Sequence, residues 1–370
     1  MDKNGYDFKT LEGKYGGFLG PAVKIKVGDT EVDSSKVPIT SLTVEIDAGK
    51  SAGGCSFVIE SMYDYENSVW TGEILNTIEI GAKIEIEAGY VEKKRVFYGF
   101  VDDYSIEYTS NGAPSLSVSG IDAKGSLMNN AEQDYKEEES TKDVIEAVLK
   151  KCKTNNSAES FTVGSLVDIK YDAQLIKDEM TDYAFLNELA ELFNMQFFVV
   201  NGEIIFDNLM SDTKVLISLT LGMSLISFKK TISTKDQISK FIVRGYDPLT
   251  NEPISGEADS TSISGPEGEE AKDKAGEIVG AVKEERNYFV TTADEAANLA
   301  QSRFDAAAFG VVKGTGKCLG IPEIIPGRYI EINGLDDKSD NIYFVTKVTH
   351  QYSGEEGYST SFEVKGAVTK

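Results

Sequence analysis

The sequence has 370 residues, a mass of 40.3 kDa and a formal net charge of −24 from 61 acidic and 37 basic residues. This length exceeds one ordinary domain, and 41% hydrophobic residues is the level of a globular protein, which excludes global disorder. The acidic residues are spread along the chain without a basic stripe, so we expect no specific nucleic-acid binding.

Residues 1–128 predict a domain built of short antiparallel strands. Apolar and polar residues alternate in several segments, which is typical of half-buried strands, and Asn111-Gly112 is a hairpin signal. Short strands at this spacing, with glycines at the bends, favour a closed or nearly closed antiparallel β-barrel. The alternating segments are residues 23–27, 42–46, 78–80, 84–86, 97–101 and 116–118.

Residues 129–212 predict a small inserted α+β domain. Ser140 and Asp143 have the spacing of a capping box before a helix whose apolar residues share one face. A second amphipathic helix follows, and then two apolar segments separated by a turn. The predicted elements are an acidic connector at 132–139, helices that start at Ser140 and at Thr181 or Asp182, and a hairpin over 196–206.

Residues 213–370 predict a second β-barrel domain. Residues 248–285 are rich in Pro, Gly, Ser and acids with little apolar periodicity, which predicts a long acidic loop. A helix is expected over 292–309. The fold class is therefore α+β, mainly β, with two antiparallel barrel domains around an inserted α+β domain. The strands expected here are 215–221, 225–229, 238–246, 329–332, 342–348 and 358–364.

The residue types of common hydrolases do not form a convincing site. His350 is the single histidine, and a strand-end side chain held by hydrogen bonds accounts for it better than a Ser-His-Asp or Cys-His arrangement. Asp102-Asp103 and Glu284-Glu285 are candidate carboxylate pairs for a glycosidase. Adjacent residues on a strand point to opposite faces, however, so neither pair is naturally convergent.

Metal and phosphate sites are not predicted either. Gly310–Lys317 lacks the spacing of a phosphate loop, and Asp336–Asp340 lacks the Gly and the final Glu of an EF-hand. Cys55, Cys152 and Cys318 show neither a disulfide framework nor zinc spacing, so we expect buried thiols. We therefore assign no catalytic, cofactor-binding or metal-binding residue, and we expect no cofactor.

Several short motifs together resemble a known family. Tyr343, Val345, Val348 and His350 match its "Tyr-x-Val-x-x-Val-x-His" strand. Further matches are the helix in 174–190, the strand at 242–248, the helix–strand–Pro-Gly signature within 291–332, and Tyr98-Gly99-Phe100-Val101. In this order they resemble the phage late control D or baseplate hub family, which includes the N-terminal part of type VI secretion spike proteins.

The resemblance implies a homotrimer whose two tube-forming barrels per subunit build a pseudo-hexameric ring. Such a ring joins a six-fold tail tube protein to a three-fold central spike protein, with tape-measure and baseplate wedge proteins as further candidate partners. Dispersed negative charge would suit a lumen that passes DNA or acidic effectors without adhesion. Because the sequence ends at Lys370, just after the second barrel, we expect the spike to be a separate protein.

The sequence thus predicts a non-enzymatic structural hub of a contractile tail or injection particle, whether phage, phage-tail-like bacteriocin or extracellular injection system. The N-terminus shows no signal-peptide pattern and no apolar run approaches the ~20 residues of a membrane helix. We therefore expect synthesis in the cytoplasm, no stable membrane insertion, and assembly into the particle. The alternatives are a tail-tip protein of a non-contractile phage that binds cell-surface glycan, and a muralytic hydrolase that uses two carboxylates.

Overall fold

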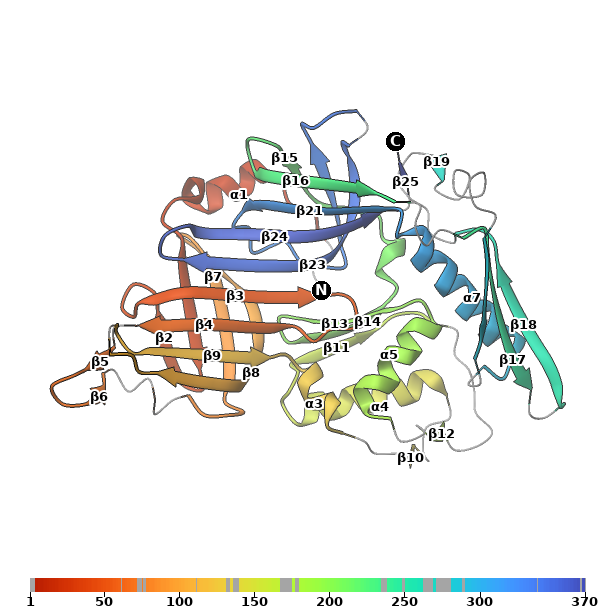
Figure 1. Cartoon of the computed structure of the whole chain (residues 1–370), viewed down its shortest axis with the longest axis horizontal. Helices are drawn as coiled ribbons and strands as arrows, with labels where there is room; N and C mark the ends of the chain where they lie inside the picture. Colours follow the sequence, from red (N-terminus) through yellow and green to blue (C-terminus); the bar gives the residue numbers. More distant parts are fainter. Residues whose placement is uncertain are drawn as a thin grey trace.

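The computed structural model describes residues 4–60, 62–71, 75, 78–110, 112–130, 134–135, 140–166, 175–176, 180–233, 238–247, 250–261, 269–270, 281–287, 290–337, 339–366 and 368–369. The fold is mainly β, and thirteen strands form one large sheet (Figure 1). These strands are β1 (Ala22–Val27), β2 (Thr30–Asp33), β3 (Ile39–Asp47), β4 (Gly54–Glu60), β7 (Lys83–Gly89), β8 (Lys93–Glu107), β9 (Ser115–Ile121), β15 (Val215–Thr220), β16 (Leu225–Ile232), β21 (Val312–Leu319), β22 (Tyr329–Asn333), β23 (Asn341–Ser353) and β24 (Gly357–Gly366).

The sheet joins the first and last parts of the chain. Its order is β16-β21-β24-β23-β3-β4-β9-β8-β7-β1-β2, and β22 and β15 branch from β23. All neighbours are antiparallel except β15 and β22. The described pairings do not close this sheet into a barrel, although β15 and β16 approach each other at the bridge Leu221–Leu225. The antiparallel β character that the sequence predicts is confirmed.

Both parts of the sheet bury their apolar residues in one cluster. In β1, β3 and β4, buried and more exposed residues alternate, as the period of two predicts. Val44 and Ile46 of β3 belong to the same cluster as Val345 and Val348 of β23. The sequence predicted two separate β regions, and this shared core was not foreseen.

Two sets of five strands in this sheet repeat the same arrangement. The first is β3-β4-β9-β8-β7 and the second is β16-β21-β24-β23-β22, and each set appears in the same order along the chain. All neighbours within each set are antiparallel. The longest strand occupies the same place in both sets, because β8 corresponds to β23. We call these sets the first and the second β unit.

The β units also share the positions of their register shifts, which establishes which residues of one unit are equivalent to which residues of the other. The register shifts lie between Ile39 and Ser41 in β3, Leu225 and Ser227 in β16, Val101 and Asp103 in β8, and Val345 and Lys347 in β23. Asp103 in β8 is taken as the equivalent of Lys347 in β23. Following the residue pairs from strand to strand across each β unit then makes Ser41 in β3 the equivalent of Ser227 in β16. Two β-bulges therefore fall at equivalent positions, as expected of structural repeats.

The region between the β units forms a second core. A three-stranded sheet in the order β11-β14-β13 packs with two capped helices, whose N-terminal Ser140 and Thr181 side chains accept backbone N–H bonds. The predicted helices and hairpin are thus confirmed, whereas the acidic connector at 132–139 lies outside the described residues apart from β10. The elements are α3 (Lys124–Met128), β10 (Asp134–Tyr135), α4 (Thr141–Thr154), β11 (Ser160–Val163), β12 (Leu175–Ile176), α5 (Asp182–Leu192), β13 (Gln196–Val200), β14 (Glu203–Asp207) and η2 (Leu209–Ser211).

The prediction of an acidic loop over 248–285 is wrong for two segments, which form strands. β18 (Glu252–Ala258) and β20 (Val282–Arg286) both pair with β17 (Lys240–Asp247), and α7 (Ala293–Ala308) packs on this sheet. β18 buries Gly256 and Ala258, small residues that produce no apolar periodicity. A short pair also forms between β19 (Glu269–Glu270) and β25 (Val368–Thr369). Residues 248–249, 262–268 and 271–280 of this segment lie outside the described residues.

The start of the chain packs on strands that come much later in the sequence. Helix α1 (Phe8–Lys14) and the turn η1 (Gly16–Phe18), which the sequence did not predict, bury Leu11 and Tyr15. The Tyr15 hydroxyl donates to Glu323 Oε1 at 2.7 Å, and the Tyr6 amide donates to the Leu216 carbonyl at 2.6 Å. This segment therefore packs against β15 and against the segment between β21 and β22.

Buried charges connect the sheet with the inserted region. Lys124, at the start of α3, has no exposed surface, and its Nζ donates to the carbonyls of Gly49 and Ser51 at 3.0 Å. The neighbouring Asp122 accepts the backbone N–H groups of Gly53 and Lys124. These bonds hold the turn between β3 and β4 against the inserted region.

Candidate functional site: the polar face of the joined sheet

The two β units meet where β23 pairs with β3. Seven consecutive pairs run from Lys347–Asp47 to Ser353–Ser41, and Lys347 Nζ lies 2.9 Å from Glu45 Oε2. Hydrogen bonding to Glu45 raises the pKa of Lys347 above its usual value. We call this pairing the internal joint.

The joined sheet has one apolar face and one polar face. At the internal joint, Val348 and His350 point into the core, whereas Thr349 and Gln351 alternate with them on the opposite side. The same side of the neighbouring strands is dominated by small hydroxyl residues. They are Ser41, Thr43, Ser56, Ser105, Ser115, Ser117, Ser119, Ser227, Thr231, Thr315, Thr349, Ser359 and Ser361.

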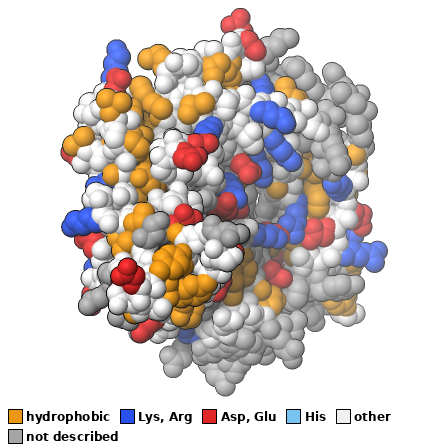
Figure 2. All heavy atoms as spheres, turned by 60° about the vertical axis from the view of Figure 1, so that its left-hand side comes forward, with side chains coloured by type: hydrophobic (Ala, Val, Ile, Leu, Met, Phe, Trp, Pro, Cys, Tyr) orange, Lys and Arg blue, Asp and Glu red, His pale blue; other side chains and the backbone are white. Residues whose placement is uncertain are grey.

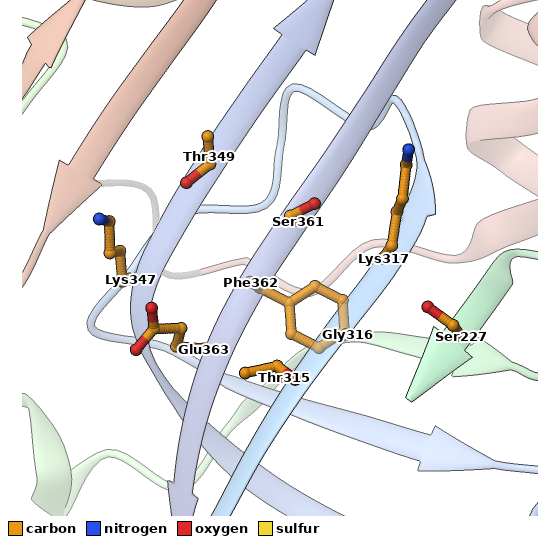
Figure 3. A pocket seen from close by; sticks show the side chains of 9 residues that line it. All are labelled: Ser227, Thr315, Gly316, Lys317, Lys347, Thr349, Ser361, Phe362 and Glu363. Atoms are coloured by element: carbon orange, nitrogen blue, oxygen red, sulfur yellow. The ribbon is translucent and has the colours of Figure 1, made fainter. Parts of the chain in front are cut away.

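This polar face is hollowed over the second β unit. A hollow of about 310 Å³ is lined by residues of β16, β21, β24 and β23 (Figure 3). Lys317 and Lys347 lie on opposite sides of it, with Ser361 between them, as Figure 3 shows. The short Ser and Thr side chains leave this space open, because longer residues at those positions would fill it.

On the polar face, a group of lysines lies on the second β unit and a group of acidic residues lies on the first. The second β unit carries five lysines there, Lys229, Lys313, Lys317, Lys347 and Lys365, beside Glu363. The first β unit carries five acids there, Glu45, Asp47, Glu60, Asp103 and Glu107. The linear sequence did not reveal this arrangement, because the lysines come from four strands that the fold brings together.

The single histidine lies on the other side of the sheet. His350 is 2% exposed, and its Nδ1 lies 2.9 Å from the Tyr358 hydroxyl and 3.1 Å from Thr360 Oγ1. The hydroxyl groups of the polar face therefore have no imidazole beside them. This agrees with the interpretation of His350 as a side chain held by hydrogen bonds.

The ionisation of His350 gives a direct test of its burial. Burial lowers the pKa of His350 to about 4 from 6.5. The unfolded chain takes up this proton below pH 6.5 and the folded chain only near pH 4, so the free energy of unfolding falls as the pH drops through this window, by about 3 kcal/mol. We expect the one imidazole NMR signal of the folded protein to titrate near pH 4, and near pH 6.5 in urea. A folded-state midpoint near 6.5 would contradict the buried position.

The candidate carboxylate pairs do not converge. Asp102 and Asp103 are exposed at the bulge of β8. In β20, Glu284 accepts from Arg244 Nε at 2.6 Å, whereas Glu285 accepts from Arg303 Nε at 3.0 Å. The glutamates are thus held by different arginines.

The remaining candidates from the sequence lie in a strand, in a turn and in the buried core. Gly310–Lys317 runs from the end of α7 into β21, and Asp336 and Asp340 lie in the turn between β22 and β23. Cys55, Cys152 and Cys318 are buried free thiols, as predicted, and burial raises the pKa of each. In the described ranges, no cluster of His, Cys, Asp and Glu could hold a metal ion, and no helix is long and apolar enough to cross a membrane.

An aromatic cluster projects at one end of the sheet, and sequence reasoning did not locate it. The hairpin of β5 (Tyr63–Asp64) and β6 (Val69–Trp70) places Tyr63 in edge-to-face contact with Tyr65, Trp70 and Tyr108. Tyr65 is 62% exposed and Tyr108 is 59% exposed. Figure 2, which brings this end of the molecule forward, shows hydrophobic side chains gathered at the level of the hairpin. Such exposed aromatic groups are typical of binding surfaces.

Solved structures similar in fold to this chain include phage tail proteins and a type VI secretion component. The 43 kDa tail protein of prophage MuSo2 from Shewanella oneidensis is 14% identical, with a TM-score of 0.69, over 93% of this chain and 98% of that chain. A tail protein from Neisseria meningitidis MC58 is 12% identical, with a TM-score of 0.68, over 94% and 97% of the two chains. An Escherichia coli type VI secretion component is 11% identical, with a TM-score of 0.56, over 94% and 77%. At the level of fold, these neighbours support the expected resemblance to phage tail and injection-system proteins.

The sequence also matches a family model. The model is described as the Alg8 N-terminal domain, and it matches residues 22–354. The chain belongs to this family. A comparison with curated protein sequences finds no match. The family match covers the first β unit, the inserted region and the second β unit up to the end of β23, and it stops before β24.

Proposed function

We propose that the chain is a non-enzymatic structural hub of a contractile tail or injection particle. In this proposal three copies form a ring that joins a tail tube protein to a central spike protein, within the late control D type of hub. The observation that carries it is the pair of corresponding β units joined edge to edge in one sheet. Three copies with two units each supply six similar units, which suits a six-fold tube above a three-fold spike.

Each β unit serves in this proposal as a tube-forming barrel. The division remains 1–128 for the first barrel domain, 129–212 for the inserted domain and 213–370 for the second. The bridge Leu221–Leu225 and the bent, bulged strands β8 and β23 support a barrel-like curvature of the units. The separate hydrophobic cluster of the inserted region supports its treatment as a domain.

The polar face is proposed to line the lumen of the ring. Short Ser and Thr side chains keep such a surface hydrated and free of large apolar groups, which favours passage of cargo without adhesion. In this proposal the lumen carries lysines on the second β unit and acids on the first, and it is therefore not uniformly acidic as the composition suggested. No catalytic group or cofactor is assigned, and tape-measure and baseplate wedge proteins remain further candidate partners. The protein would act after assembly into a particle.

A glycan-binding tail-tip protein is the second candidate function, favoured by the exposed aromatic cluster around Trp70. Aromatic rings can stack on sugars, and Trp70 Nε1 donates to the Tyr108 hydroxyl at 3.1 Å, which fixes the ring. If this function holds, Trp70→Ala abolishes binding to cell-wall polysaccharide, whereas Leu19→Ala, at another exposed apolar residue, leaves binding unchanged. A muralytic hydrolase would instead release peptidoglycan fragments in a turnover assay.

The mass of the protein in solution tests the hub. We expect light scattering to give three times the mass of 40.3 kDa, either for the chain alone or after co-expression with the proteins encoded beside it. The ring buries the exposed strand edges of the β units, which provides the driving force. A chain that stays monomeric with every tail component would contradict the hub and favour glycan binding.

A further inference from the structure

Each β unit has a strand edge with no partner among the described strands, and the equivalent edge of the other β unit is paired at the internal joint. In β8, the segment from Asp103 to Glu107 pairs with β9 on one side, and no described strand pairs with its other side. Its equivalent in β23 pairs with β24 on one side and with β3 on the other. Likewise β16, the equivalent of β3, pairs only with β21 among the described strands.

We propose that β8 of one copy pairs with β16 of the next copy, in the antiparallel register of the internal joint. This rests on the proposed ring and assigns the strands that close it. The correspondence between the two β units, which the bulges establish, transfers the register of the internal joint to these two strands. It places Tyr104 opposite Ile232, Ser105 opposite Thr231, and Glu107 opposite Lys229 of the next copy. The second copy is therefore bound head to tail, an arrangement that generates a closed ring when the rotation between copies closes.

The exposure of the inward-facing side chains supports this pairing. At the internal joint, Val348 and Ile46 are directly opposed and are 0% and 3% exposed. Their equivalents Tyr104 and Ile232 are 38% and 56% exposed in the single chain. Pairing of the two strands would bury these side chains as the internal joint buries theirs, and it would add cross-strand hydrogen bonds along edges that have no described partner strand.

Charge complementarity supports the same pairing and the same order of units. At the internal joint, acidic Glu45 of the first β unit contacts basic Lys347 of the second. In the proposed pairing, acidic Glu107 of the first β unit faces basic Lys229 of the second β unit of the next copy. Acidic and basic units would therefore alternate around the whole ring, with attraction at every joint.

Cysteine cross-linking tests the register directly. The full chain carrying Ser105→Cys and Thr231→Cys is oxidised mildly in the preparation used for light scattering, and its mass is measured under denaturing, non-reducing conditions. We expect covalent oligomers that end at three chains and are lost on reduction. Cys55, Cys152 and Cys318 are buried and should leave the wild-type chain uncross-linked.

Two controls use the same chemistry at other positions. Glu45→Cys with Thr349→Cys bridges the opposed pair of the internal joint, and should form a disulfide within one chain. Ser105→Cys with Ser227→Cys displaces one thiol by four residues, roughly 13 Å along the strand, and should give no oligomers because a disulfide needs Cα atoms within about 7 Å.

A charge exchange provides an independent readout. Lys229→Glu and Glu107→Lys should each weaken association at least about tenfold, since each creates a like-charged pair at every joint between copies, and the double variant should regain most of the loss. Lys153→Glu, an exposed change on α4, is the matched control. A light-scattering trimer that neither cross-links at Ser105 and Thr231 nor responds to these charges would overturn this pairing alone. A chain that remains monomeric with its tail partners would overturn the ring and the pairing together.

Discussion

Replacing Lys124 with Ala is expected to lower the free energy of unfolding by about 4 kcal/mol, measured from urea denaturation at pH 7.5. The substitution leaves the Asp122 carboxylate buried without its neighbouring cation and the carbonyls of Gly49 and Ser51 without a donor. It also removes the ammonium from its place 4.7 Å from the centre of the Phe197 ring. The turn between β3 and β4 would then lose its attachment to the inserted region.

The loss caused by this substitution should depend on pH. Burial raises the pKa of Asp122 to about 6 and lowers the pKa of Lys124 to about 8. Below pH 6 the variant can protonate Asp122, so we expect a smaller loss at pH 5 than at pH 7.5. Asp122→Asn together with Lys124→Met should lose less than Lys124→Ala, because no buried charge remains. Lys153→Ala, at an exposed lysine of α4, is the control, and an equal loss there would contradict the role of Lys124.

Replacing Gly256 with Ala, in the small sheet of β17, β18 and β20, should lower the free energy of unfolding by about 3 kcal/mol. A Cβ at this position would lie 2.2 Å from the Ala296 carbonyl carbon and from the Ala297 nitrogen, both backbone atoms of α7. Backbone atoms of a helix cannot rotate away as a side chain can, so α7 must separate from β18. The urea midpoint should fall, and hydrogen exchange should accelerate in α7.

A second glycine provides the matched control for this change. Gly354 lies in the turn between β23 and β24, and an added Cβ there would meet no described atom within 4 Å beyond its chain neighbours. Gly354→Ala should therefore leave both the urea midpoint and the exchange of α7 unchanged. If Gly256→Ala behaves like Gly354→Ala, α7 does not pack on β18 as closely as described.

Local patterns were sufficient to predict the elements that have strong local signals. The Ser140 cap and the apolar face of α4, and the Thr292 and Glu295 capping box of α7, are readable from spacing alone. Helix α1 was not predicted, because its only buried residue within the helix is Leu11, which produces no periodicity. β18 was missed for a similar reason, since its buried positions are Gly256 and Ala258.

The candidate site depended on contacts that no short segment encodes. Lys347 and Glu45 are unremarkable charged residues in the sequence, and they become neighbours only because β23 pairs with β3. The strand patterns predict two β domains around an insert, but their correspondence as repeats becomes visible only through strand order and bulges. The aromatic cluster likewise required the fold to bring Tyr108 beside Trp70.

The internal joint has a consequence for how the chain is made. Asp47 of β3 pairs with Lys347 of β23, so 300 residues separate the partners. At the usual pace of translation, β3 waits roughly 15–60 s on the ribosome before its partner emerges. During this interval its edge is open to neighbouring nascent chains on the same messenger. Slowing synthesis ahead of residue 341, or depleting the chaperones that cover nascent strands, should therefore shift newly made protein toward aggregates while leaving the finished fold as stable as before.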